Sequence, residues 1–93
     1  MISYPAARLT ILEYLDKTGI DVDLLEEETM HLDFGWVFFY QSREYLRSGN
    51  LSYALAGNAP IIIDRQTGQI NETGTAYSVD YYIEKYKAKS GLS

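Results

Sequence analysis

Five consecutive apolar residues, Trp36 to Tyr40, constrain the fold of this chain more than any other feature. Their aromatic and β-branched side chains favour a strand, and side chains alternate between the two faces of a strand. One face would carry Trp36, Phe38 and Tyr40, and the other Val37 and Phe39. Either this strand is central and covered on both sides, or one apolar face is kept for a partner.

The segment before this strand is rich in acidic residues. Met30, Leu32 and Phe34 alternate with polar residues, and this period of two indicates another strand. The preceding run of three glutamates would place an acid-rich strand at a sheet edge, where charge discourages edge-to-edge aggregation. Residues 33–35 then offer a turn into the central strand.

A β-hairpin is predicted in the second half of the chain. The β-branched run Ile61 to Ile63 and the returning segment Gln69 to Asn71 flank the turn Arg65 to Gly68. Gly68 supplies the positive φ that such a loop needs near its end.

Helices are predicted at both ends of the chain. In the first, Ser3 is the N-cap, Pro5 lies in the first turn, and an apolar stripe recurs at helical spacing: Tyr4, Ala7, Ile11, Leu12 and Leu15. Gly19 supplies the left-handed exit. Ser78 caps the last helix, whose stripe faces the core: Val79, Tyr82, Ile83 and Tyr86.

The middle of the chain, residues 42–60, is the least regular part. A short helical turn is expected from Ser42 to Arg47, and Leu51 to Ala56 offers another before the loop Gly57 to Pro60. The element order is then α-β-β-loop-β-β-α. It predicts an α+β fold: a four-stranded antiparallel sheet flanked by an N-terminal and a C-terminal helix, both on one face. The 93 residues suit a single domain spanning 1–93.

Composition excludes several classes of function. The chain has no cysteine, so disulfides, thiolate metal sites and thiol nucleophiles are excluded. The net charge of −5 disfavours binding to nucleic-acid phosphates. No apolar run approaches the ~18 residues of a membrane span, and no signal peptide is present, so we expect a cytoplasmic protein.

The sequence offers almost no catalytic chemistry. His31 is the only histidine, and neither a metal-ligand spacing nor a phosphate-binding glycine loop is present. The spacing of Asp21, Asp23 and the three glutamates matches no calcium loop, and a solvated edge explains them more simply. We therefore expect no enzyme, no cofactor and no bound metal.

Tyrosine is unusually frequent, with nine in the chain. Tyrosine is enriched at protein interfaces because it contacts widely at low entropic cost and keeps a polar group. Tyr40, Tyr45, Tyr53 and Tyr77 lie near expected loops or strand ends, where some must reach solvent. Either this set contributes a binding face, or the rings line the core with their hydroxyls at its rim.

Several motifs resemble those of the YrhB-like proteins, a grouping also described as immunity protein 35 of bacterial polymorphic toxin systems. The resemblance covers nearly the whole chain and is most specific where Gly57-Asn58-Ala59-Pro60 precedes Gly68 and Gly74. The other segments that carry it are Gly35-Trp36 with Phe38 and Tyr40, Arg43 to Gly49, Leu55-Ala56, Ile61 to Asp64, Thr67-Gly68 and Gly74-Thr75.

The resemblance implies two different functions. The first is an immunity protein that binds and neutralises a cognate toxin, and the acidic charge suits a basic one such as a nuclease. The second is a small heat-stress chaperone, a holdase of the YrhB type. The family provides no toxin-binding residues to carry over, so the candidate partner-binding residues come from charge and position: Glu26, Glu27, Glu28, Asp33, Tyr45 and Tyr53. The oligomeric state stays open.

Overall fold

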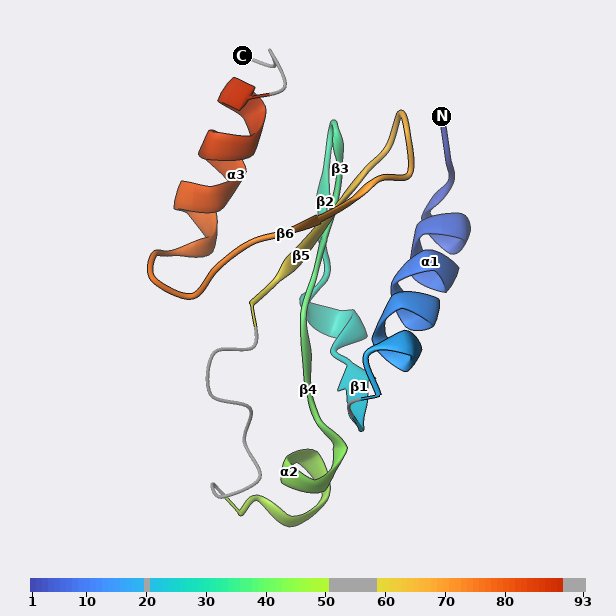
Figure 1. Ribbon diagram of the computed structural model, residues 1–93, viewed down its shortest axis with the longest axis vertical. Coiled ribbons are helices and arrows are strands. Elements are labelled where there is room, and N and C mark those ends of the chain that lie inside the picture. Colours follow the sequence, from blue (N-terminus) through green and yellow to red (C-terminus); the bar gives the residue numbers. More distant parts are fainter. Residues whose placement is uncertain (20, 51–58, 90–93) are drawn as a thin grey trace.

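The computed structural model describes residues 1–19, 21–50 and 59–89. Helices at the two ends of the chain flank antiparallel strands, which confirms the predicted α+β class (Figure 1). The elements are α1 (Tyr4–Lys17), β1 (Val22–Leu24), the 3₁₀ helix η1 (Glu26–Glu28), β2 (Met30–Leu32), β3 (Gly35–Phe38), β4 (Tyr40–Ser42), α2 (Arg43–Ser48), β5 (Ile61–Asp64), β6 (Ile70–Glu72) and α3 (Val79–Lys89).

The main sheet has four antiparallel strands, as predicted, and their order in the sheet is β2-β3-β5-β6. Strand β3 is central, and Trp36 lies opposite His31 of β2 and Ile63 of β5. The predicted hairpin is β5–β6, and Gly68 in its turn has a φ of 74°. These pairings place β2 and β6 at the two edges of the sheet.

A second sheet of two strands, β1 and β4, was not predicted. The apolar run of the central strand divides at Phe39, whose carbonyl accepts a hydrogen bond from the N–H of Leu25. Beyond this point the chain pairs with β1, and Leu24 lies opposite Tyr40. The prediction that the three glutamates belong to an edge strand is also wrong. They form η1, and only the residues of β2 that follow them pair with the main sheet.

The two terminal helices lie on opposite faces of the sheet, and the expectation that they share one face is wrong (Figure 1). On the α1 face, Trp36 and Phe38 pack with Ile11 in one buried cluster. On the α3 face, Val37 packs with Ile83 in another, which also contains Ile62. Because β3 and β5 are apolar on both faces, each face needs its own cover. This settles the open question about the central strand: it is covered on both sides.

Both helices begin where the sequence predicted. Ser3 Oγ accepts a hydrogen bond from the N–H of Ala6 (3.3 Å), and Ser78 Oγ accepts one from the N–H of Tyr81 (3.3 Å). Along α1 the side chains that become buried are Ala7, Ile11 and Leu15. On α3 only Ile83 is buried, so the C-terminal helix packs less deeply than the N-terminal one.

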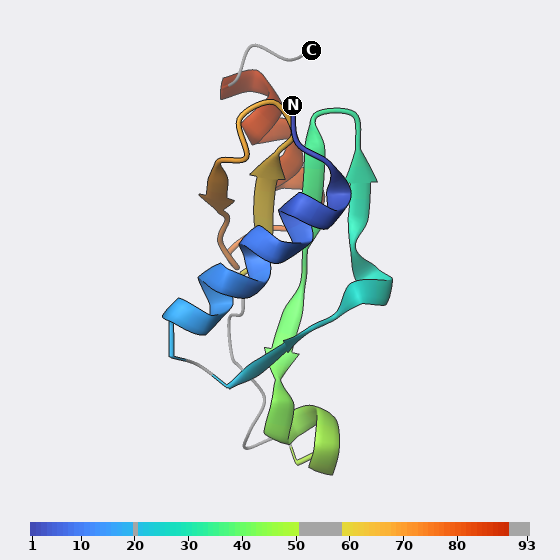
Figure 2. The same ribbon diagram turned by 90° about the vertical axis from the view of Figure 1, so that its right-hand side faces the viewer.

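The helix α1 crosses its face of the sheet from one edge to the other (Figure 2). Near its start, the ring of Tyr4 lies 4.9 Å from that of His31 on β2. Near its end, the Tyr14 hydroxyl donates a hydrogen bond to Glu72 on β6. These two contacts show that a single oblique helix reaches both edge strands on this face.

The short helix expected after the central strand is α2, and Gly49 at its C-terminus has a φ of 71°. The second turn expected at residues 51–56, like Tyr53 and the Gly57-Asn58 pair, lies outside the described residues.

Candidate functional site

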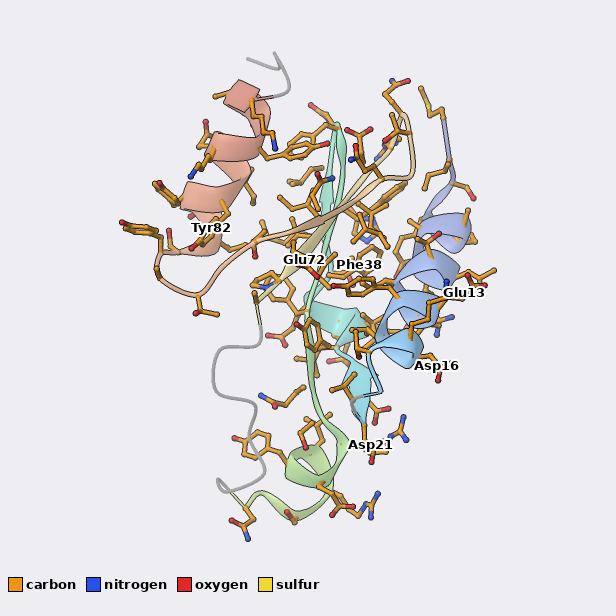
Figure 3. All side chains as sticks on the ribbon, viewed as in Figure 1. Glu13, Asp16, Asp21, Phe38, Glu72 and Tyr82 are labelled. Atoms are coloured by element: carbon orange, nitrogen blue, oxygen red, sulfur yellow. The ribbon has the colours of Figure 1, made fainter. Side chains whose placement is uncertain are left out.

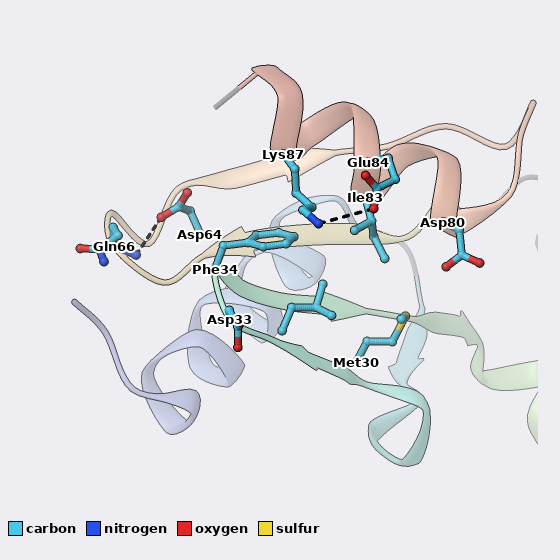
Figure 4. Close-up of a pocket in the computed structure, with 10 residues that line it drawn as sticks. Met30, Asp33, Phe34, Asp64, Gln66, Asp80, Ile83, Glu84 and Lys87 are labelled. Carbon is cyan, nitrogen blue, oxygen red and sulfur yellow. Dashed lines mark hydrogen bonds and ion pairs between the residues drawn. The ribbon is translucent and has the colours of Figure 1, made fainter. Parts of the chain in front are cut away.

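A groove of about 630 Å³ opens between β2 and α3 (Figure 4). Its floor is apolar and comes from the sheet edge and the helix: Met30, Leu32, Phe34 and Ile83. The three β2-side residues are only half-buried, although they pack against the buried cluster under α3. The groove therefore exists because α3 leaves this side of the sheet partly uncovered.

The rim of the groove is acidic. Four carboxylates line it, from three separate elements of the chain: Asp33, Asp64, Asp80 and Glu84. Among the described residues of the lining, Lys87 is the one that is basic, and its Nζ lies 3.5 Å from Glu84 Oε1. Four carboxylates against one ammonium give the groove a negative potential, which attracts cationic groups at moderate salt.

Asp64 has a structural task in addition to its place on the rim. It accepts hydrogen bonds from the Tyr86 hydroxyl and from the N–H groups of Gln66 (2.7 Å) and Thr67 (3.2 Å). Burial alone would raise the pKa of Asp64, but these hydrogen bonds outweigh it and hold the pKa below its usual value. The ring of Tyr86 also stacks on Phe34 at 5.3 Å, so this carboxylate ties α3 to the end of the groove.

The Asp64 network predicts a loss of stability in acid. A carboxylate with a lowered pKa in the folded state stabilises the fold above its unfolded pKa of about 3.9, and this stabilisation disappears as the pH falls through the lower, folded pKa. Replacement Asp64→Asn should therefore flatten the pH dependence of the unfolding midpoint below about pH 5. Urea titrations at several pH values would test this, with Asp16→Asn on the exposed end of α1 as the control. An unchanged pH profile for Asp64→Asn would contradict it.

Of the five predicted partner-binding residues that the structure describes, only Asp33 lies in the groove. Glu26, Glu27 and Glu28 lie at the other end of β2, where η1 and the two preceding leucines border a separate hollow of about 600 Å³. Glu26 is also engaged by Arg8 of α1, through a bidentate ion pair. The hydrogen bond from Arg8 lowers the pKa of the Glu26 carboxyl.

Tyr45, the predicted tyrosine that the structure describes, is not part of the groove. Tyr45 is half-buried on α2, at the opposite end of the molecule from the β2–β3 turn that carries Asp33 (Figure 1). Tyr53 lies outside the described residues. The five described residues thus lie on three separate parts of the surface and not on one face.

Sequence reasoning missed most of the rim. Asp80 and Glu84 are four residues apart on α3, a spacing that places two side chains on the same side of a helix. That spacing was available in the sequence. Their position opposite Asp33 was not, because it depends on how α3 crosses the sheet.

The other side of α3 has the opposite character. Lys85 and Lys89 line a smaller hollow of about 340 Å³ over β6, and the Lys85 ammonium lies 5.8 Å from the ring of Tyr81. Tyr77 and Tyr81 are 62% and 42% exposed, with their rings 4.3 Å apart. Figure 3 shows Tyr82, the neighbour of Tyr81, on α3, and Glu72 on β6. The helix therefore separates the acidic groove from a surface of mixed charge that is rich in tyrosine.

Within residues 1–19, 21–50 and 59–89, no group of three or more histidine or acidic side chains is arranged to hold a metal ion. In the same part of the chain, no helix has the length and apolar character needed to cross a membrane.

Fold and groove together define a small α+β protein with an open, apolar-floored and acidic-rimmed groove at one sheet edge. Residues 7–89 match the family model described as immunity protein 35, and the chain belongs to this family. It is also similar to the Uncharacterized protein YrhB of Escherichia coli (strain K12), with 41% identity over 91 residues, which is 96% of this chain and 93% of that protein. No solved structure matches the chain significantly. The family supports a general role as an immunity protein.

Proposed function

We propose that this protein binds and neutralises a cognate bacterial toxin by direct protein–protein contact. Membership of the immunity protein 35 family supports the role, and the groove between β2 and α3 supplies a surface for it. The observation that carries the proposal is the combination of an apolar floor with four carboxylates around it. An apolar centre with a charged rim is the usual anatomy of a protein-binding surface.

The negative charge of the groove favours a basic protein as the partner. A basic protein would be steered toward the acidic rim, and its association would slow as the salt concentration rises. Nucleic-acid phosphates would be repelled by the same carboxylates. The proposal is therefore binding of a basic toxin, without catalysis by this chain.

Charge reversal can distinguish the contributions that the two acidic surfaces of the molecule make to toxin binding. The double variant Asp33→Lys/Glu84→Lys alters the groove, and Glu27→Lys/Glu28→Lys alters η1 at the other end of β2. Both variants change the net charge from −5 to −1, because each replacement of a carboxylate by an ammonium adds two charges. They are thus matched in overall charge and differ only in position.

The protein should be co-expressed with the product of the neighbouring open reading frame. We expect the wild type to form a stoichiometric complex and to restore growth. The groove variant should associate about tenfold more slowly, or bind about tenfold more weakly, and should protect poorly. The η1 variant should retain protection. Full protection by the groove variant with loss in the η1 variant would move the interface to Glu27 and Glu28; a lack of any complex would reject immunity against that neighbour.

A second candidate function is that of a holdase, and the exposed pair Tyr77 and Tyr81 favours it. A holdase needs adaptable exposed apolar surface and accepts many clients. If this role is correct, the protein should suppress aggregation of unrelated heated proteins, and Tyr77→Ser/Tyr81→Ser should weaken the suppression while leaving toxin binding intact. Absence of suppression by the wild type would remove this candidate.

A further inference from the structure

We propose that the groove receives a basic amphipathic helix of the partner, packed beside α3 on the same face of the sheet. This inference rests on the proposed function and specifies the element of the partner that the groove recognises. It follows from how the two faces of the sheet are covered, from the open edge of β2, and from the distribution of charge.

The four-stranded sheet is wider than one helix can cover. Four strands spaced about 4.8 Å apart are roughly 19 Å wide, whereas a helix with its side chains is about 10 Å wide. The helix α1 solves this by crossing its face obliquely, from His31 on β2 to Glu72 on β6. On the other face, α3 runs roughly along the strands and leaves the β2 side open (Figure 4). By these dimensions the strip left beside α3 is roughly 9 Å wide, about the width of one further helix.

The floor of this strip is apolar. Met30 and Leu32 point to the α3 face from alternate positions of β2, and Phe34 continues the row. Together with Ile83 they form an apolar surface whose exposed part lacks a covering element among the described residues. A helix that presents apolar residues three and four positions apart would complete this layer in the same way that α3 does.

The short edge of β2 disfavours a strand as the occupant. The N–H of Arg65 donates to the carbonyl of Phe34, so by alternation the backbone of Trp36 faces β5. The opposite residue, His31, then directs its own N–H and C=O away from β3, toward the open edge. With only three residues in β2, a partner strand would gain the hydrogen bonds of essentially one residue pair. Such an edge is too short to hold a partner by strand addition.

The charge of the rim favours a basic helix over an acidic one. The rim carboxylates lie on both sides of the apolar floor, with Asp33 on the β2–β3 turn and Asp80 and Glu84 on α3 (Figure 4). An occupying helix with lysine or arginine on both flanks of its apolar stripe would meet opposite charge on each side. An acidic helix would be repelled from both sides.

The test uses three synthetic peptides, each about 18 residues long, which is sufficient for partial helix formation. The first has leucine at helical spacing with lysine on the flanks. The second has the same composition arranged in strict alternation, and the third replaces lysine by glutamate.

Binding to the isotope-labelled full chain would be followed by NMR. We expect only the first peptide to bind saturably and to shift the signals of Met30, Leu32 and Ile83. Its affinity should fall about tenfold in Asp33→Lys/Glu84→Lys and change less than about twofold in Glu27→Lys/Glu28→Lys.

Equal binding of the alternating or the acidic peptide, shifts confined to other surfaces, or no saturable binding would overturn the helix inference. A second measurement uses the toxin complex itself, with a photo-crosslinking residue in place of Met30 and a control at the exposed Leu9 of α1. Crosslinks from position 30 to basic partner segments at intervals of three and four residues support a helix, and intervals of two overturn it. A protein that protects cells but fails both tests loses this inference and keeps the proposed function, whereas failure to protect removes the function itself.

Discussion

Replacement of Gly35 by alanine is expected to prevent stable folding. A Cβ atom at this position would lie 2.1 Å from the carbonyl oxygen of Ile63 and 3.2 Å from the backbone nitrogen of Arg65. Both contacts are with backbone atoms of β5 and the turn after it, which cannot rotate away as a side chain could. Relief would require the two central strands, β3 and β5, to separate at the end where Gly35 lies opposite Asp64. Glycine is used where two backbones approach this closely.

We expect Gly35→Ala to cost more than about 4 kcal/mol, a loss found only when a specific structural feature is broken. A 93-residue domain has about 5–14 kcal/mol of stability in total, so such a loss leaves little or none. Gly49→Ala is the matched control, since its φ is +71° with no atom within 4 Å of the added Cβ, and it should cost only about 1–2 kcal/mol. Urea unfolding followed by the fluorescence of Trp36, which is 2% exposed, would measure both. Similar midpoints for the two variants would contradict the prediction.

Truncation of Phe38 to alanine is expected to cost about 3–5 kcal/mol. Phe38 is fully buried in the cluster under α1, and the ring of Tyr4 stacks on it with centroids 6.2 Å apart. Removal of the ring leaves a cavity between the central strand and the helix, and a rigid sheet beneath one helix has little freedom to close it.

The neighbouring residue supplies the control for this substitution. Phe39 is the same residue type, but it is half-buried and packs at the margin of the cluster under α3. Phe39→Ala should therefore cost clearly less than Phe38→Ala, because part of its side chain is already in water. Chemical denaturation of both variants at one pH would compare them. An equal or larger loss for Phe39→Ala would show that the α3 face carries more of the stability than its burial indicates.

The sequence predicted the individual elements of this fold well because local chemistry determines them. Ser3 and Ser78 cap their helices through side-chain oxygens, which act within one turn of the chain. The β5–β6 hairpin depends on Gly68, whose positive φ is a property of the turn itself. The apolar run of β3 indicated a strand with two apolar faces, and it left open whether both are covered within the fold or one is kept for a partner.

Long-range arrangement was predicted less well. The two strands β1 and β4 are three residues each, and their pairing depends on a contact between segments about twenty positions apart. Three successive glutamates carry no periodicity that distinguishes a 3₁₀ turn from an edge strand. The bidentate pairing of Glu26 with Arg8 of α1 is a tertiary contact that the local pattern does not contain.

The sequence by itself determined the fold class of this protein, its helix caps, its hairpin and a strand that is apolar on both faces. Its resemblance to the immunity protein 35 family is confirmed by the match over residues 7–89. Only the tertiary structure decided which face each helix covers, and thereby where a groove remains. The reason is geometric: Asp33, Asp64 and Asp80 are far apart in sequence, and they share a rim because α3 packs along one face of the sheet while α1 crosses the other.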